Sequence, residues 1–277
     1  MATSAVERPN YQPYSRNWNS IAAGVWLASA MLGQLAFFAY IAVFYVWPAL
    51  LSHPEAWNEN PLLNQPPVQP GAAIDTFAFG MHAIGASIVA LMGGLQIVHQ
   101  VRNHFPTFHR WNGRLFVTTV VALSLSGYYI VWVRGPFPDE FSELGTSFNG
   151  LLILGFSWMA VRAAMARKFA VHERWAIRLF LVSNAQWFLR IGGFGYFAIM
   201  QALGYEVASD GWFFKAWIWG CFIVPLIIAE IHFRTRNTLD IAVQRAVTGM
   251  WVVCTLLTLF GSAIFSTFMV QLLTGNL

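Results

Sequence analysis

Charged residues are scarce in this chain: Asp, Glu, Lys and Arg together make up 10% of its 277 residues. Soluble domains carry roughly 25% charged residues, so most of this sequence has no polar face to present to water. Hydrophobic residues make up 57% of the chain, and its mean hydropathy is +0.54. The shortage of charge therefore excludes a soluble globular domain and indicates an integral membrane protein.

Cysteines and catalytic motifs are also few. Cys221 and Cys254 both lie in apolar stretches, which favours small core residues over a disulfide framework or a CxxC metal site. The sequence contains no GxGxxG, Walker A, HExxH or GxSxG motif and no carboxylate cluster at catalytic spacing. Catalytic residues therefore stay unassigned, and the sequence does not decide whether the protein is an enzyme.

Long apolar stretches are abundant instead. A helix needs about 20 apolar residues to cross the hydrocarbon core of a bilayer. Seven stretches reach this length: 21–47, 74–98, 115–133, 148–166, 175–203, 212–232 and 247–273. We predict an all-α, polytopic membrane protein with about seven transmembrane helices, in which residues 1–20 form a polar tail and residues 21–277 form a single domain. The fifth stretch is long enough to tilt or to break at its glycine-rich segment, 192–195.

Basic residues are concentrated in alternate loops. The tail and the loops after the second, fourth and sixth stretches contain Arg8, Arg16, Arg102, Arg110, Arg114, Arg167, Lys168, Arg174, Arg234, Arg236 and Arg245. The other loops carry mainly acids. The positive-inside rule therefore places the N-terminus in the cytoplasm and the C-terminus outside, for a multi-pass protein of the inner (cytoplasmic) membrane. Because the net charge of +4 resides in these short loops, it does not indicate nucleic-acid binding.

One phrase occurs twice in the sequence. Arg-Trp-x-x-Arg-Leu-Phe stands at 110–116 and again at 174–180, each time just after a histidine, His109 or His172. If the phrase marks a duplication, spans two to five form a four-helix core, residues 74–204, built from two equivalent helix pairs. Alternatively, arginine and tryptophan are both enriched at membrane boundaries, and similar phrases arise there without duplication.

The arginines of each phrase are four residues apart, so they share one face of a helix. Arg110 and Arg114 form the first pair, and Arg174 and Arg178 form the second. Their guanidinium groups can bind lipid phosphates, haem propionates or a carboxylate such as Glu173. The alternative is a basic aromatic collar that only anchors the chain at the inner interface.

Two ionisable residues fall deep inside predicted spans. His82 lies in span two and Arg190 in span five, at similar depths in the outer half of the bilayer. Ionisable residues at such depth are candidates for function. The alternatives are a neutral histidine bonded to a neighbouring hydroxyl or carbonyl group, and a structural ion pair between Arg190 and Asp75.

Residues 75 to about 190 resemble a family of predicted bacterial membrane proteins, the domain of unknown function 2306. The residues that carry this resemblance are Met81-His82, Gly85, Gly94-Leu95-Gln96, His109 to Arg114, His172 to Arg178, and Arg190. The chain reads Trp-Ala-Ile-Arg where the family more often has Trp-Met-Ile-Arg. The resemblance implies a membrane location and no established activity.

The histidines also resemble, more distantly, those of cytochrome b561-like proteins, in which paired histidines bind haem iron. This resemblance implies His82, His109 and His172 as iron ligands, with His99 or His109 opposite His172. For a redox protein, we expect Arg110, Arg114, Arg178 and Arg190 to contact the cofactor, for instance the haem propionates. Span four begins Thr146-Ser147-Phe148-Asn149, without the histidine that would pair with His82. Solvated or lipid-facing loop histidines are the alternative.

Three functions stay open on this basis. The first is a redox protein that binds b-type haem or quinone within the four-helix core. The second is a small-molecule transporter or ligand-binding protein with its site around His82 and Arg190. The third is an accessory subunit of a larger membrane complex. The expected partners are the lipid bilayer, a quinone or other small molecule, and other membrane subunits, with no nucleic acid.

Overall fold

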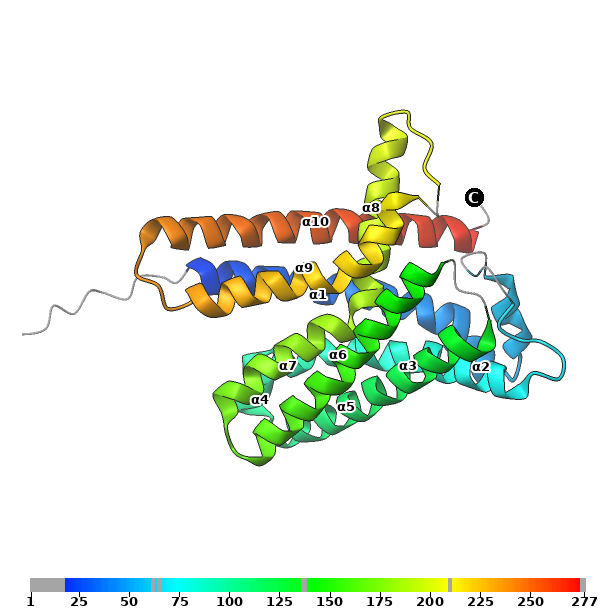
Figure 1. Ribbon diagram of the computed structural model, residues 1–277, viewed down its shortest axis with the longest axis horizontal. Helices are drawn as coiled ribbons and strands as arrows, with labels where there is room; N and C mark the ends of the chain where they lie inside the picture. The colour runs from blue at the N-terminus through cyan, green and yellow to red at the C-terminus, as the bar shows by residue number, and fades with distance from the viewer. Residues whose placement is uncertain (1–17, 61–62, 64–65, 136–138, 209–210, 275–277) are drawn as a thin grey trace, which may run out of the picture.

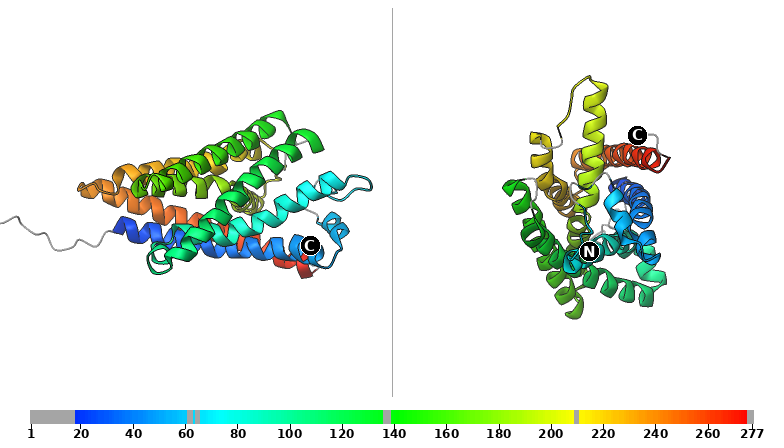
Figure 2. Two further views of the ribbon diagram at one scale, coloured as in Figure 1. Left: turned by 90° about the horizontal axis from the view of Figure 1, so that it is seen from below. Right: turned by 90° about the vertical axis from the view of Figure 1, so that its right-hand side faces the viewer.

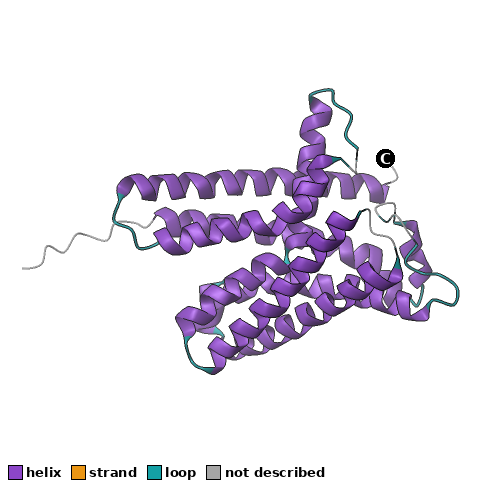
Figure 3. Cartoon of the chain, viewed as in Figure 1, coloured by secondary structure: helices purple, strands orange, loops and turns teal. Residues whose placement is uncertain are grey.

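The computed structural model describes the chain except for residues 1–17, 61–62, 64–65, 136–138, 209–210 and 275–277. Within the described ranges every regular element is a helix and none is a strand (Figure 3). This confirms the predicted all-α class. The predicted polar tail lies outside the described residues, except that its last residues, 18–20, begin the first helix.

The elements follow one another in this order: α1 (Trp18–Ile41), η1 (Ala42–Val46), α2 (Trp47–Leu50), η2 (Pro54–Glu59), α3 (Ala73–Ile97), α4 (His99–His104), α5 (Pro106–Tyr129), η3 (Ile130–Arg134), α6 (Glu140–Met165), α7 (Phe169–Ser183), α8 (Ala185–Ala202), α9 (Trp212–Thr235) and α10 (Ile241–Thr274). The segments η1 and η3 are π-helical turns that continue α1 and α5. Six helices in the described part are long and apolar enough to cross a membrane. They are the continuous helix Trp18–Leu50, α3, the continuous helix Pro106–Arg134, α6, α9 and α10.

The fifth predicted span differs from the sequence-based expectation. It is two helices, α7 and α8, and the break falls at Asn184 rather than within segment 192–195, which is helical. Asn184 ends α7, and its side-chain amide donates a hydrogen bond to the carbonyl group of Phe180 at 2.8 Å. The prediction of a break at the glycines is therefore wrong, and the predicted single fifth span is a broken one.

The glycines of α8 serve close packing instead. A β-carbon at Gly192 would collide with the indole of Trp217 on α9. On the opposite side, a β-carbon at Gly261 of α10 would collide with the backbone carbonyl of Ile191. Glycine at these positions lets α8 pass closely between α9 and α10.

The helices form two groups. In the first, α3 packs on α5, α5 on α6, α6 on α7, and α7 returns to α3. In the second, α1 packs along α10, α10 on α8, and α8 on α9. The two groups touch where α1 contacts α3 and where α9 contacts α6 and α7. The first group contains the predicted core spans two to four and only the first half of span five. The second half, α8, runs steeply across the other helices (Figures 1 and 2).

The helix ends that carry basic loops gather at one end of the molecule. The start of α1, helix α4, the turn between α6 and α7, and the turn between α9 and α10 all lie there (Figure 1). We call this the basic end, because its loops contain Arg102, Arg167, Lys168, Arg234 and Arg236. The chain reverses tightly between α6 and α7 through Arg167, which adopts a left-handed φ of 56°.

Candidate functional site

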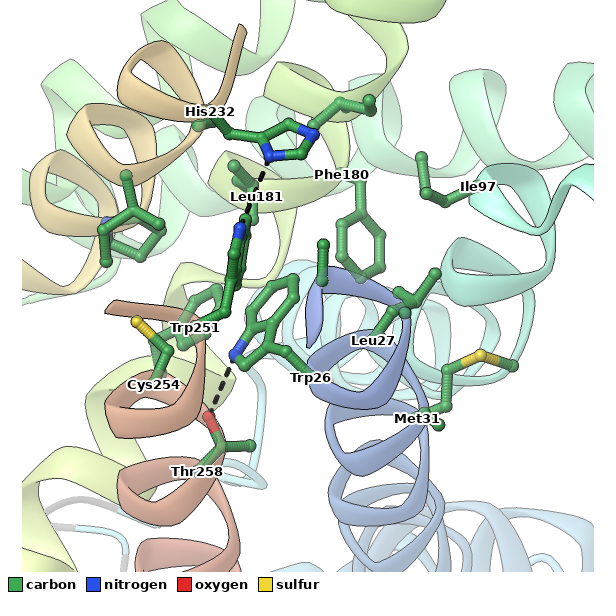
Figure 4. Close-up of a pocket in the computed structure, with 18 of the residues that line it drawn as sticks. Trp26, Leu27, Met31, Ile97, Phe180, Leu181, His232, Trp251, Cys254 and Thr258 are labelled. Atoms are coloured by element: carbon green, nitrogen blue, oxygen red, sulfur yellow. Dashed lines mark hydrogen bonds between the residues drawn. The ribbon is translucent and has the colours of Figure 1, made fainter. Parts of the chain in front are cut away.

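A cavity of about 1000 Å³ lies between the two helix groups (Figure 4). Helices α1, α3, α7, α8, α9 and α10 contribute most of its lining, and α4 and α5 contribute at the basic end. The volume is at the upper end of the range for small-molecule sites. Its position follows from the broken fifth span, because α7 packs with the first group and α8 with the second.

Two tryptophans form an aromatic wall of this cavity. Trp26 of α1 and Trp251 of α10 lie against each other with ring centroids 5.2 Å apart (Figure 4). The indole N–H of Trp26 donates to Oγ1 of Thr258 at 3.2 Å, and that of Trp251 donates to Nδ1 of His232 at 3.4 Å. With both N–H groups bonded, the wall presents the apolar ring surfaces to a ligand.

Apolar side chains continue this wall around the cavity. The labelled lining residues of this kind are Leu27, Met31, Ile97, Phe180, Leu181 and Cys254 (Figure 4). None of them carries a charge or a strong hydrogen-bonding side chain. This part of the cavity therefore suits a hydrocarbon chain or an apolar ring system.

The basic end of the cavity is polar. Its lining there includes Gln96, His99, Gln100, Arg102, His109, His172 and Glu173. Glu173 is the one carboxylate in the lining, and two arginines pair with it: Arg102 at 3.2 Å and Arg236 at 3.6 Å. Arg102 also contacts the ring of His99. Two arginines around one carboxylate leave this end with a positive charge.

The structure brings His109 and His172 to the same cavity, from α5 and α7. Nδ1 of His172 lies 2.9 Å from the carbonyl oxygen of Ala160. A carbonyl group can only accept, so Nδ1 carries the proton and Nε2 of the neutral ring has a free lone pair. Nδ1 of His109 is buried and has no hydrogen-bond partner among the described residues. Buried polar atoms without a hydrogen-bond partner are rare in proteins.

The arginines of the repeated phrase do not line the cavity. Arg114 lies over the ring of Trp111 at 4.7 Å, and Arg178 lies over the ring of Trp175 at 4.5 Å. The two copies of the phrase therefore make the same cation–π contact between residues three apart on a helix. Arginines of the phrase also have polar partners within the protein.

Arg178 forms an ion pair with Glu230 of α9, at 2.6 Å. Arg110 is exposed and donates to Oγ1 of Thr107 at 3.2 Å. The contacts of Arg110, Arg114 and Arg178 are thus internal to the protein. They agree with the anchoring interpretation of the phrase, and the predicted role toward a cofactor stays a prediction.

His82 lies apart from the other two histidines. Its Nδ1 is 3.1 Å from the carbonyl oxygen of Leu123 and 3.1 Å from Oγ of Ser126, both on α5. It does not line the cavity between the helix groups. The partners of Nδ1 are a carbonyl and a hydroxyl group of the kind that the sequence offered as the alternative to a ligand, and the role of His82 toward a cofactor stays a prediction. The described contacts of His82 include no second histidine that would complete a haem site.

Arg190 also lies outside the cavity. Its Nη1 donates to the carbonyl oxygen and to Oε1 of Gln186, and its guanidinium carbon is 5.2 Å from the ring centroid of Phe37. Asp75 is not its partner, because the carboxylate of Asp75 accepts a hydrogen bond of 2.6 Å from Tyr129. The expected Arg190–Asp75 ion pair is therefore absent from the described contacts.

Sequence reasoning missed the wall of the cavity. Trp26, His232, Trp251 and Thr258 belong to spans one, six and seven, which the sequence only placed around the core. Their meeting depends on contacts between residues as far apart as Trp26 and Thr258, which no local pattern encodes. The available signal was weak, because both tryptophans lie within five residues of the start of a predicted span, where tryptophan is usual for membrane anchoring alone.

Comparison with known proteins gives one match. The family described as "Predicted membrane protein (DUF2306)" matches residues 79–233. No curated protein and no solved structure matches the chain. The matched range contains His82, His109, His172 and Arg190, and it leaves out α1 and α10, which form the tryptophan wall. This multi-pass membrane protein therefore belongs to the family of predicted membrane proteins named domain of unknown function 2306.

Proposed function

We propose that the protein binds a membrane-soluble molecule of the quinone class in the cavity between the two helix groups. The observation that carries the proposal is the buried Nδ1 of His109, which has no partner among the described residues and stands at the polar end of an otherwise apolar cavity. A quinone has a polar ring on a long hydrocarbon tail, which matches the polar end and the apolar remainder of the cavity. The proposal concerns binding and leaves the electron donor open.

The polar end supplies hydrogen-bonding groups for a quinone ring. A quinone oxygen accepts hydrogen bonds, and both His109 and the amide of Gln96 line this end. A buried polar group without a partner costs about 1–3 kcal/mol. A ligand oxygen that accepts from His109 would remove this cost, which supports a carbonyl-bearing head over a purely apolar ligand.

The apolar part of the cavity supports the tail. Trp26 and Trp251 offer ring surfaces, and Leu27, Met31 and Phe180 add aliphatic and aromatic surface (Figure 4). Burial of apolar surface contributes roughly 25 cal/mol per Å². A tail of several isoprenoid units therefore provides most of the affinity, and the histidine end fixes the orientation of the ring.

A b-type haem is the second candidate, favoured by the anchored ring of His172. A histidine whose Nδ1–H donates to a carbonyl group is held in orientation and offers Nε2 to a metal, as metal-binding histidines usually do. His109 lines the same cavity and would be the opposite ligand, and Arg102 would face a propionate. Haem would supply one-electron transfer. We place it second because Arg110, Arg114 and Arg178, implied for the cofactor, do not line the cavity.

We further propose that the basic end faces the cytoplasm of a bacterial cell, with the N-terminus inside and the C-terminus outside, in the inner membrane. Support comes from the collection of Arg102, Arg167, Lys168, Arg234 and Arg236 at one end of the molecule (Figure 1). In this orientation the head of the ligand lies near the cytoplasmic side of the bilayer.

One set of measurements on the detergent-purified protein tests the proposal. We expect solvent extraction to recover quinone, and a decyl-tailed benzoquinone to quench tryptophan fluorescence in a saturable manner. The variant His109→Leu should bind about tenfold more weakly, because it loses one buried hydrogen bond. The matched control is Arg110→Gln, which changes the neighbouring exposed residue and should bind normally.

The absorption spectrum distinguishes the two candidates. A Soret band with a positive pyridine haemochrome reaction, both lost in His172→Ala, would replace quinone by haem. A colourless protein that yields no quinone and shows no saturable quenching would refute both.

A further inference from the structure

Unpartnered polar atoms also gather where α1, α8 and α10 cross. They are Nε2 and Oε1 of Gln34, Nε1 of Trp187 and Oγ of Ser262, none of which has a hydrogen-bond partner among the described residues. The exposed fractions of the three side chains are 1%, 1% and 9%. A different helix contributes each of them, and Gln34 and Ser262 lie in the interior of long apolar helices, while Trp187 lies in the first turn of α8. Several such atoms in one region indicate a bound polar species.

A glycine brings these side chains to the α1 backbone. At Gly33 a β-carbon would collide with the hydroxyl of Ser262 and would lie 2.8 Å from Cζ2 of Trp187. Because glycine stands there, α8 and α10 approach α1 closely. The polar atoms of three helices can then share one small volume.

The next turn of the same three helices contains a charge. The guanidinium carbon of Arg190 lies 5.2 Å from the ring centroid of Phe37, and the ring of Phe265 meets that of Phe37 at 5.9 Å. Each of these three residues is three positions beyond one of the unpartnered side chains on its own helix. Residues three apart lie on the same side of a helix. Arg190 therefore stands one turn from the unpartnered atoms, on the faces that meet.

The charge of Arg190 is not neutralised by any carboxylate in the described part of the chain. Its hydrogen bonds go to the carbonyl and side-chain oxygens of Gln186, and the ion pairs of the protein involve other arginines. An arginine packed among apolar helices needs a polar partner, water or a ligand anion, because an unpaired charge is costly to bury.

We propose that a small monoanion of the size of chloride or formate binds at this crossing. The guanidinium of Arg190, the indole N–H of Trp187, the hydroxyl of Ser262 and the amide NH₂ of Gln34 are all able to donate. Among these groups, only Oε1 of Gln34 can accept but not donate a hydrogen bond. A set dominated by donors and carrying a positive charge suits an anion and disfavours a cation.

This site is separate from the proposed quinone site. None of Gln34, Trp187, Arg190 and Ser262 lines the cavity between the helix groups. The region matched by the family includes Trp187 and Arg190 but excludes the α1 and α10 contributions. Either proposal can therefore fail while the other stands.

The test uses the purified full-length protein and chloride itself as the probe. Thermal unfolding is followed while sodium chloride replaces sodium gluconate at constant ionic strength. A ligand that binds only the folded state raises the unfolding midpoint in a saturable manner. We expect this rise in the wild type and its loss in Arg190→Gln. The matched control, Arg110→Gln, removes an exposed arginine and should keep the full effect.

A second variant and a second readout cover a failure of Arg190→Gln to fold. Trp187→Phe keeps the ring but removes one donor, and should weaken chloride about tenfold, since a hydrogen bond to a charged group is worth about that factor. Broadening of the chloride NMR line, reversed by bromide, measures binding without reference to stability. Equal chloride effects in wild type and Trp187→Phe, or equal effects of gluconate and chloride, would overturn the proposal and leave bound water as the partner of these atoms.

Discussion

The ion pair between Arg178 and Glu230 is expected to hold the two helix groups together beside the cavity. Nε and Nη2 of Arg178 both lie close to Oε1 of Glu230, at 2.7 Å and 2.6 Å. Arg178 belongs to α7 of the first group and Glu230 to α9 of the second. Arg178 is further packed over the rings of Trp175 and Phe233. The variant Glu230→Gln removes the charge while keeping the shape.

The size of the effect follows from burial. The side chains of Arg178 and Glu230 are 18% and 39% exposed. Exposed ion pairs contribute about 0.2–1 kcal/mol, and breaking a fully buried pair costs about 3–5 kcal/mol. This half-buried pair lies between these limits, so Glu230→Gln should lower the free energy of unfolding by about 1–2 kcal/mol.

A double-mutant cycle with Arg178→Gln isolates the interaction from other effects of each change. The free energies of unfolding would be measured in mixed micelles by denaturation with SDS. Glu206→Gln is the control, because Glu206 is exposed and has no ion pair among the described residues. A coupling energy below about 0.3 kcal/mol is what two independent sites would give. It would refute a stabilising ion pair between Arg178 and Glu230.

Two further changes test the packing of α8 and the start of α6. Gly192→Val should destabilise the protein by about 1–3 kcal/mol, because the added atoms overlap the Trp217 indole. The control in the same unfolding assay is Gly155→Ala, which should be neutral or stabilising because a β-carbon there meets nothing within 4 Å. Asp139 accepts hydrogen bonds from the backbone N–H and hydroxyl of Ser142, and the hydroxyl bond is the main reason that its pKa lies below the ordinary value. A lowered folded-state pKa stabilises the protein above the ordinary value of about 4, and this contribution is lost as the pH falls through the folded value. Asp139→Ala should therefore lower the unfolding midpoint at pH 7, with a difference that shrinks on acidification, and a pH-independent difference would contradict this reasoning.

The fold was predictable as far as it depends on local composition. Stretches of about 20 apolar residues must become helices in a bilayer, because their backbone groups have no other partners there. This argument located α3, α5, α6, α9 and α10. It could not locate the break at Asn184, because the apolar length of a stretch does not show where a helix inside it ends. The glycines that suggested a break instead pack closely against α9, at Gly192 and Gly193, and against α10, at Gly195.

The candidate site was predictable only in part. His109 and His172 were recognised because each precedes a copy of the repeated phrase, and the structure brings both to one cavity. His82 was singled out by its depth and by the two resemblances, and the structure gives it hydrogen-bond partners on α5 instead of a place in the cavity. The position of a residue along a predicted span does not show which side chains of other helices surround it.

The sequence by itself determined that this chain is a multi-pass, all-α membrane protein with its basic residues at one end, because hydrophobic length and loop charge are local properties. Only the tertiary structure decided where a ligand can bind. The cavity exists because α7 packs with one helix group and α8 with the other, and its aromatic wall exists because Trp26 meets Trp251 across the whole length of the chain. Contacts between helices depend on side-chain shape and on single positions such as Gly33 and Gly192, where a missing β-carbon sets how closely helices approach.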